Sequence, residues 1–118
     1  MAFQATHRYA RISARKVRRL ADLIRGRLAD EAIEVLRYQP HRGARLLEKV
    51  LRSAVGNAQD SEQNRGRTAN ADRLIVVEAR VDGGPIMKRF RPRARGMAFP
   101  VLRRTAHIHI AVEDIDSL

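Results

Sequence analysis

A strongly basic segment in the last third of the chain is the clearest candidate for binding chemistry. It runs Lys88-Arg89-Phe90-Arg91-Pro92-Arg93-Ala94-Arg95-Gly96, and five of its first eight residues are cationic. No acidic residue occurs between Pro85 and Val112. Burying unpaired guanidinium groups is very costly, so this segment cannot form a core of its own. It is either a solvated loop or a binding site for a polyanion, and its position at the turn of a predicted hairpin favours the polyanion.

The other residue types that could do chemistry do not form a recognisable site. His107 and His109 share a strand face at a spacing that can hold a metal ion, but no cysteine or nearby carboxylate completes a ligand set. No serine stands in a nucleophile-elbow context, and the chain has no phosphate loop and no dinucleotide fingerprint. We therefore expect no catalytic residues, no metal site and no cofactor.

The composition of the whole chain also favours a nucleic-acid partner. Lys and Arg number 24 against 13 for Asp and Glu among 118 residues, which gives a formal net charge of +11. Arginine predominates over lysine, which favours bidentate contacts to phosphate. A balance this basic implies nucleic acid, with an anionic membrane as the weaker alternative. Without cysteine, and without an apolar run long enough for a signal segment or membrane span, we expect one cytoplasmic domain.

Two alternating stretches predict the long hairpin that presents the basic segment. Apolar side chains recur with period two over residues 75–81 and again over residues 106–112, which is typical of strands with one buried face. Antiparallel pairing of the two apolar faces places the turn at Arg93-Ala94, and only even register slips keep those faces together. The predicted pairs are Ile75 with Val112, Val77 with Ile110, Ala79 with Ile108 and Val81 with Ala106.

The hairpin extends well beyond the rest of the chain in this prediction. We assign residues 1–82 and 105–118 to a body and about residues 83–104 to an arm. Each leg of the arm is about 30 Å long at about 3.3 Å per residue, whereas a domain of this size has a radius of gyration of about 13–14 Å. Gly83-Gly84-Pro85 predicts a bulge or bend at the base of the arm. Pro92 and Pro100 argue against regular pairing along its whole length, and we expect a partner to order it.

Strand and helix patterns in the remaining residues complete a fold. We predict a weak, edge-lying strand over residues 2–11, helices over 14–25, 30–37 and 42–59, and an exposed loop over 60–72. The predicted fold class is α+β, with three helices packed on a small antiparallel sheet and a long protruding β-hairpin.

Helix punctuation and charge add detail to this fold. Ser13 is a good N-cap for the first helix, Gly26 stands where a helix ends, and Asp30 can cap the second helix. The outer face of the first helix is mostly cationic, which is compatible with a solvated surface or, as the total charge favours, with contacts to RNA phosphates. The cations on that face are Arg15, Arg18 and Arg19.

Several short motifs along the chain occur in an order and spacing that are familiar from other proteins. They are Ser13-Ala14-Arg15-Lys16-Val17-Arg18, Ala21-Asp22-Leu23-Ile24-Arg25-Gly26, Lys49-Val50-Leu51-Arg52-Ser53-Ala54 with Asn57-Ala58, Gly84-Pro85, Met87-Lys88-Arg89, Pro92-Arg93-Ala94-Arg95-Gly96 and Arg103-Arg104-Thr105-Ala106-His107-Ile108. Together they span nearly the whole chain, and they resemble the bacterial large-subunit ribosomal protein of the L-twenty-two family. Met97, where that family usually has a basic residue, and Gly83, where it usually has an acidic one, depart from the pattern.

The resemblance implies a structural role rather than catalysis. It implies binding to large-subunit ribosomal RNA, a part in early subunit assembly, and a hairpin that lines the polypeptide exit tunnel opposite an extension of the ribosomal protein of the L-four family. The implied partners are that RNA, neighbouring large-subunit proteins and the nascent polypeptide, with no membrane and a monomer outside the ribosome. The implied tunnel-lining residues are Met87, Lys88, Arg89, Pro92, Arg93, Ala94, Arg95, Gly96, Met97 and Ala98.

Charge pattern and resemblance together give the candidate RNA-binding residues. They are Arg8, Arg11, Ser13, Arg15, Lys16, Arg18, Arg19, Arg25, Lys88, Arg89, Arg91, Arg93, Arg95, Arg103 and Arg104. Two other hypotheses stay open on the residues alone. A DNA-architectural protein with a basic β-arm is the first, because such proteins wedge apolar or proline tips between base steps. A basic metal-dependent nuclease is the more distant one.

Overall fold

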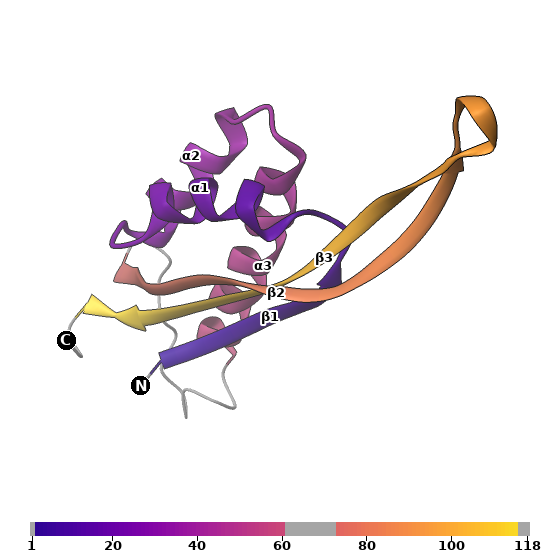
Figure 1. The fold of residues 1–118 in the computed structure, drawn as a ribbon. Coiled ribbons are helices and arrows are strands. Elements are labelled where there is room, and N and C mark those ends of the chain that lie inside the picture. The colour runs from indigo at the N-terminus through magenta and orange to yellow at the C-terminus, as the bar shows by residue number, and fades with distance from the viewer. Residues whose placement is uncertain (1, 61–72, 116–118) are drawn as a thin grey trace.

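The computed structural model describes residues 2–60 and 73–115, which form three α-helices and a three-stranded antiparallel sheet (Figure 1). The elements are β1 (Ala2–Ala10), α1 (Ala14–Ile24), α2 (Ala29–Tyr38), α3 (Arg42–Gln59), β2 (Leu74–Pro92) and β3 (Ala98–Asp114). The predicted α+β class is confirmed. Residues 61–72 of the predicted loop lie outside the described residues.

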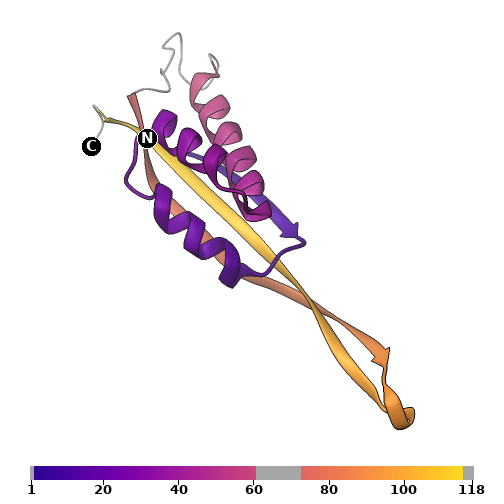
Figure 2. The same cartoon turned by 90° about the horizontal axis from the view of Figure 1, so that it is seen from above.

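The helices cover one face of the sheet and leave the other face open. The strand order is β1-β3-β2, so β3 is central and the N-terminal strand lies at an edge, as predicted. From above, α1 runs beside β2 while α3 lies over β1 and β3 (Figure 2). The core consists of the inward face of β3 packed against the apolar stripes of the helices. Its largest fully buried side chains are Val17, Ile24, Leu36, Leu47, Leu51, Leu74, Val76, Ile108, Ile110 and Val112.

The ends of the first two helices show which punctuation signals hold. Ser13 is at the N-cap of α1, and Gly26 has φ +84 just beyond its end, as predicted. The prediction that Asp30 caps α2 is wrong, because Leu28 is the N-cap and Asp30 lies inside the first turn. Tertiary pairing sets this start: Gly26 N–H donates to the Val76 carbonyl, and Leu28 forms an antiparallel bridge to β2. Asp30 still lies where the helix dipole favours a carboxylate.

The register of the hairpin differs from the prediction by a bulge. Val77 is an extra residue between two ladder pairs, and its side chain is 38% exposed, whereas Leu74 and Val76 before it are buried. The bulge lets Val76 and Ala79 both face the core, which strict alternation does not allow. The predicted pairs are therefore wrong, although the inward face of β3 is correct. The observed pairs are Val76 with Val112, Ala79 with Ile110, Val81 with Ile108 and Gly83 with Ala106.

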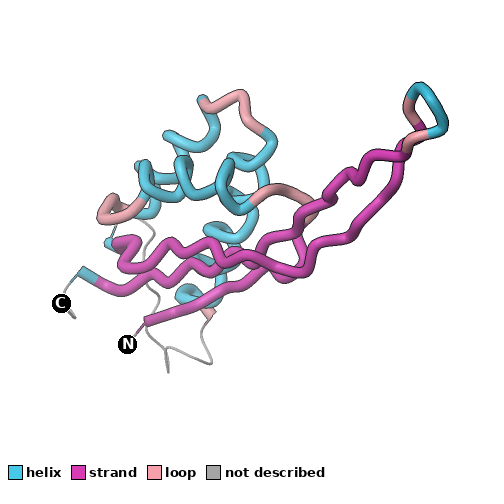
Figure 3. Tube along the Cα trace, in the orientation of Figure 1, coloured by secondary structure: helices cyan, strands magenta, loops and turns pink. Residues whose placement is uncertain are grey.

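The predicted arm is confirmed, and its pairing is more regular than expected. Beyond a second register shift between Gly83 and Ile86, the ladder runs without interruption to Pro92, which pairs with Ala98. The prediction that prolines disrupt this ladder is wrong. Beyond the end of β1 the sheet has only two strands, so both are edge strands, where proline is tolerated. The molecule measures 67 × 27 × 18 Å with a radius of gyration of 17.6 Å. Figure 3 shows the two strands of the arm extending beyond the helices.

The tip of the arm is a short turn at Ala94–Gly96. Arg95 and Gly96 both have positive φ, at 62° and 69°, and Arg93 N–H donates to the Met97 carbonyl at 2.7 Å. The turn is therefore centred on Arg95 rather than at Arg93-Ala94, because the two extra residues on β2 move it forward against β3.

Candidate nucleic-acid interface

The base of the arm is fixed by a close approach of the two strands. Thr105 is buried, and its hydroxyl donates a hydrogen bond of 2.6 Å to the Pro85 carbonyl. A Cβ on Gly84 would lie only 2.4 Å from the Thr105 Oγ1 atom. Glycine is therefore required at this point of the bulge, which supports the predicted role of the Gly-Gly-Pro sequence. The joint sets the direction in which the arm leaves the body.

Helix α1 presents its cations along the edge of the sheet. Val17, Leu20, Ala21 and Ile24 are buried, so Arg15, Lys16 and Arg19 point outward. Arg18 Nε donates to the Val81 carbonyl at 3.0 Å. Arg25 bonds both the Ala79 carbonyl and the Asp22 carboxylate. These two arginines tie α1 to β2, a structural role that the sequence did not indicate, and each guanidinium keeps further N–H donors for another partner.

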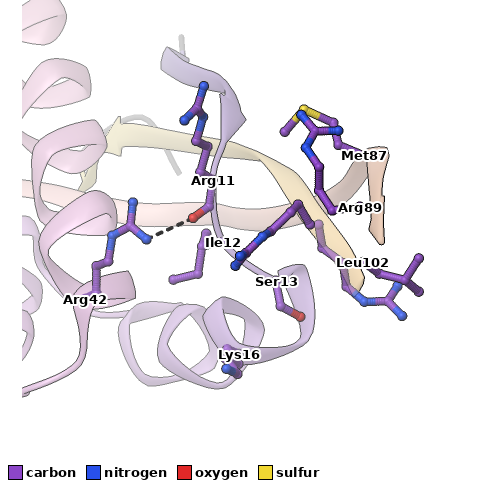
Figure 4. A pocket seen from close by; sticks show the side chains of 10 residues that line it. Arg11, Ile12, Ser13, Lys16, Arg42, Met87, Arg89 and Leu102 are labelled. Carbon is purple, nitrogen blue, oxygen red and sulfur yellow. Dashed lines mark hydrogen bonds between the residues drawn. The ribbon is translucent and has the colours of Figure 1, made fainter. Parts of the chain in front are cut away.

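An open groove of about 760 Å³ lies where the arm leaves the body (Figure 4). Its walls come from the β1–α1 connection, the starts of α1 and α3, and both strands of the arm. Six of its ten lining side chains are cationic and none is acidic. The lining residues are Arg11, Ile12, Ser13, Lys16, Arg42, Met87, Arg89, Leu102, Arg103 and Arg104.

Arg42 belongs to this groove but was missed in the sequence analysis. It is the first residue of α3, and its Nη1 donates to the Arg11 carbonyl at 3.0 Å (Figure 4). A cation in the first turn of a helix opposes the helix dipole. An arginine at the start of a predicted helix could therefore have indicated, from the sequence alone, that Arg42 has a role other than stabilising the helix. The helix N-terminus adds further positive potential to the groove.

A second hollow extends the basic surface toward the outer face of α1. It is about 490 Å³ in volume, and it shares Ser13 and Arg104 with the groove. Arg15 and Arg18 are its other cations, and none of the described residues that line it is acidic. The two hollows therefore form one basic surface from α1 to the arm.

The predicted RNA-binding residues separate into groups. Arg11, Ser13, Arg15, Lys16, Arg18, Arg89, Arg103 and Arg104 line the groove or the second hollow. Lys88, Arg91, Arg93 and Arg95 lie exposed further along the arm, and all the predicted tunnel-lining residues belong to the arm as well. Arg8 is exposed on β1, Arg19 is exposed on α1, and Arg25 is held at the β2 edge. The structure thus brings about half of the predicted set together around one junction.

Comparison with known proteins decides the family. The family described as "Ribosomal protein L22p/L17e" matches residues 5–113, which is most of the chain. The chain belongs to this ribosomal protein family. Its role is accordingly structural and not enzymatic, in agreement with the resemblance of its motifs.

Several curated relatives are similar along nearly their whole length. A protein named "Large ribosomal subunit protein uL22" from Rhodopirellula baltica is 56% identical over 98% of each chain. Proteins of the same name from Caldicellulosiruptor saccharolyticus and Finegoldia magna are 46% and 45% identical, over 93% and 97% of this chain. They are matched over 86% and 97% of their own lengths. The sequence similarity to these relatives therefore covers both the body and the arm.

The described residues contain neither a metal-binding cluster nor a membrane-spanning helix. Within residues 2–60 and 73–115, no three His, Asp or Glu side chains lie where they could hold a metal ion together. His109 instead bonds Thr6 Oγ1 at 3.1 Å and lies 3.4 Å from Asp82, on the open face of the sheet. No helix among the described residues is long and apolar enough to cross a membrane.

Proposed function

We propose that this chain is a structural constituent of the large ribosomal subunit and binds large-subunit ribosomal RNA through the groove at the base of its arm. The observation that carries this proposal is the convergence of six cationic side chains around one open junction, where none of the described lining residues is acidic. Like charges brought this close repel one another, so the arrangement favours a bound polyanion. The uL22 relatives are named as proteins of the large ribosomal subunit, which supports ribosomal RNA as this polyanion.

Phosphate neutralisation is the physical basis of this binding. Arg89, Arg103 and Arg104 approach from the arm, and Lys16 and Arg42 approach from the helices. Guanidinium groups bind phosphate oxygens in a bidentate manner, so these contacts fix orientation as well as affinity. Each neutralised phosphate releases counterions, and the logarithm of the binding constant falls with the logarithm of salt concentration by about 0.7–0.9 per contact. Recognition of folded RNA by shape, with arginine planes on exposed bases, adds selectivity.

The arm extends this role in the same proposal. Body residues 1–82 and 105–118 dock on the RNA surface, and the arm of about residues 83–104 enters between RNA helices, whose contacts hold it in place. The segments 87–89 and 92–98 then line the polypeptide exit tunnel and face the nascent chain. Docking of the body contributes to early assembly beside neighbouring large-subunit proteins. This ribosome is in the cytoplasm, and the protein is a monomer when it is not bound to the ribosome.

Sedimentation of a tagged copy in cell lysate tests this function. We expect the full-length chain to stay with the large subunit after a high-salt wash that strips loosely bound basic proteins. A tagged copy that sediments free in the same gradient would contradict the proposal. Sedimentation with nucleoid DNA would instead support a DNA-architectural protein with a basic arm.

A further inference from the structure

The outer half of the arm has one uncharged face. In a two-stranded ladder, alternate residues of each strand share a face. Between the Lys88–Leu102 pair and the tip, every residue on one face is uncharged. These residues form two ladder pairs, Phe90 with Pro100 and Pro92 with Ala98. The opposite face of the same stretch has Arg89 and Arg91 paired with Val101 and Phe99. Arg89 and Arg91 are therefore separated from the apolar plate across the thickness of the ribbon, and Lys88 borders the plate on its own face.

Phe90 and Pro100 form the centre of this plate. They are direct cross-strand partners, and the Phe90 side chain is 72% exposed. A ring this exposed gains little from burial in the fold, so it contributes little to stability. A solvent-exposed aromatic ring with cations at the two flanking positions of its strand is instead typical of surfaces that stack on unpaired bases.

The charges around the plate decide which occupant fits it. The arm contains seven cations and no acid over residues 83–104. A protein segment would have to be strongly acidic to approach all of these cations. A nucleic acid supplies phosphates for the cations and flat, apolar bases for the ring.

We propose that Phe90, backed by Pro100, is a stacking platform for an unpaired base of large-subunit ribosomal RNA. This inference rests on the proposed function and adds a contact that electrostatics alone does not provide. The platform lies between residues 87–89 and 92–98, the two segments proposed to line the tunnel. It anchors the middle of the arm to RNA, while the charged groove anchors the base.

Binding of the full chain to purified large-subunit ribosomal RNA, measured across a salt series, tests the platform. Phe90→Ala removes the ring, and base–aromatic stacking of about 1–3 kcal/mol predicts a loss of affinity of about 5- to 150-fold. The slope of log affinity against log salt stays unchanged, because no charge is lost. Phe90→Tyr keeps the ring and the affinity. Phe90→Leu keeps apolar area without a flat ring and binds almost as weakly as the alanine variant.

Arg91→Gln is the matched control on the neighbouring position. It lowers the salt slope by about one contact, about 0.7–0.9, so its signature differs from that of Phe90→Ala. Wild-type affinity in Phe90→Ala, or in Phe90→Leu, would overturn the stacking platform while leaving the proposed function intact. Failure of the wild-type chain to bind this RNA would overturn both.

A photocrosslinking residue at position 90 identifies the occupant in intact cells. We expect benzoylphenylalanine at that position to crosslink to large-subunit ribosomal RNA. Crosslinking to protein alone would overturn the inference and would assign the plate to a protein partner.

Discussion

Replacement of Gly84 by alanine is expected to strain the joint between body and arm. The new Cβ would lie 2.4 Å from Thr105 Oγ1 and 3.3 Å from the Thr105 carbonyl carbon. Thr105 is buried and short, and its hydroxyl is bound to the Pro85 carbonyl, so it cannot turn away without losing that bond. Relief requires loss of a hydrogen bond worth about 0.5–1.5 kcal/mol or a backbone shift of the kind that costs about 1–3 kcal/mol.

We therefore expect Gly84→Ala to lower the free energy of unfolding by about 1–3 kcal/mol. For a chain of this length that corresponds to about 4 °C in melting temperature for each kcal/mol. Thermal and urea unfolding followed by circular dichroism measure the change. Gly83→Ala is the matched control, because nothing lies within 4 Å of the position that its new Cβ would take and the substitution restricts the unfolded chain.

The clash can be tested separately by removing its partner atom. Thr105→Ala alone loses the hydrogen bond to Pro85, and Gly84→Ala added to it should cost much less than it does in the wild-type background. Equal stability of the Gly84→Ala and Gly83→Ala variants would refute the close approach. Strict additivity of the double variant would refute Thr105 as its cause.

Three other predictions concern the body and its charge. Gly26→Ala should destabilise the fold by about 1 kcal/mol, because Gly26 has a φ of +84°. Gly56→Ala should stabilise it by about 1 kcal/mol, because Gly56 lies inside α3 and nothing is within 4 Å of the added Cβ. Urea unfolding of the two variants measures both changes. Leu51→Ala should cost about 2–5 kcal/mol because the side chain is fully buried, and a loss below about 1 kcal/mol would contradict its place in the core. Added salt should raise the melting temperature of the wild-type chain by screening the groove, and by less in Arg103→Gln/Arg104→Gln.

Local patterns in the sequence predicted the helices and one strand well, because those patterns coincide with the buried surface. The bounds of α3, Arg42–Gln59, match the predicted range, because its apolar residues recur at helical spacing and form the buried face of the helix. Ser13 and Gly26 mark the ends of α1: Gly26 supplies a positive φ just beyond the helix, and Ser13 occupies the N-cap position although its side chain makes no capping hydrogen bond. The inward face of β3 follows from strict alternation, since that strand has no bulge in its body half.

Features that depend on contacts between distant segments could not be predicted in this way. The bulge at Val77 exists because Val76 is held by the segment after α1 while Ala79 must still face the core. Asp30 has the right chemistry for an N-cap, but pairing of Leu28 with β2 starts the helix earlier. Arg42 reaches the groove only through the packing of α3 beside the β1–α1 connection. Alternation and capping rules contain no information on such pairings.

The central claim is that the groove at the base of the arm neutralises RNA phosphates, and the salt dependence of binding to purified large-subunit ribosomal RNA tests it most directly. Two doubly substituted chains lose the same charge, Arg103→Gln/Arg104→Gln in the groove and Arg37→Gln/Lys49→Gln outside it. The groove variant should bind more weakly and lower the log–log slope by about 1.4–1.8, while the control variant keeps the wild-type slope. Equal slopes for the two variants would mean that net charge, rather than the groove, determines binding, and would contradict the account.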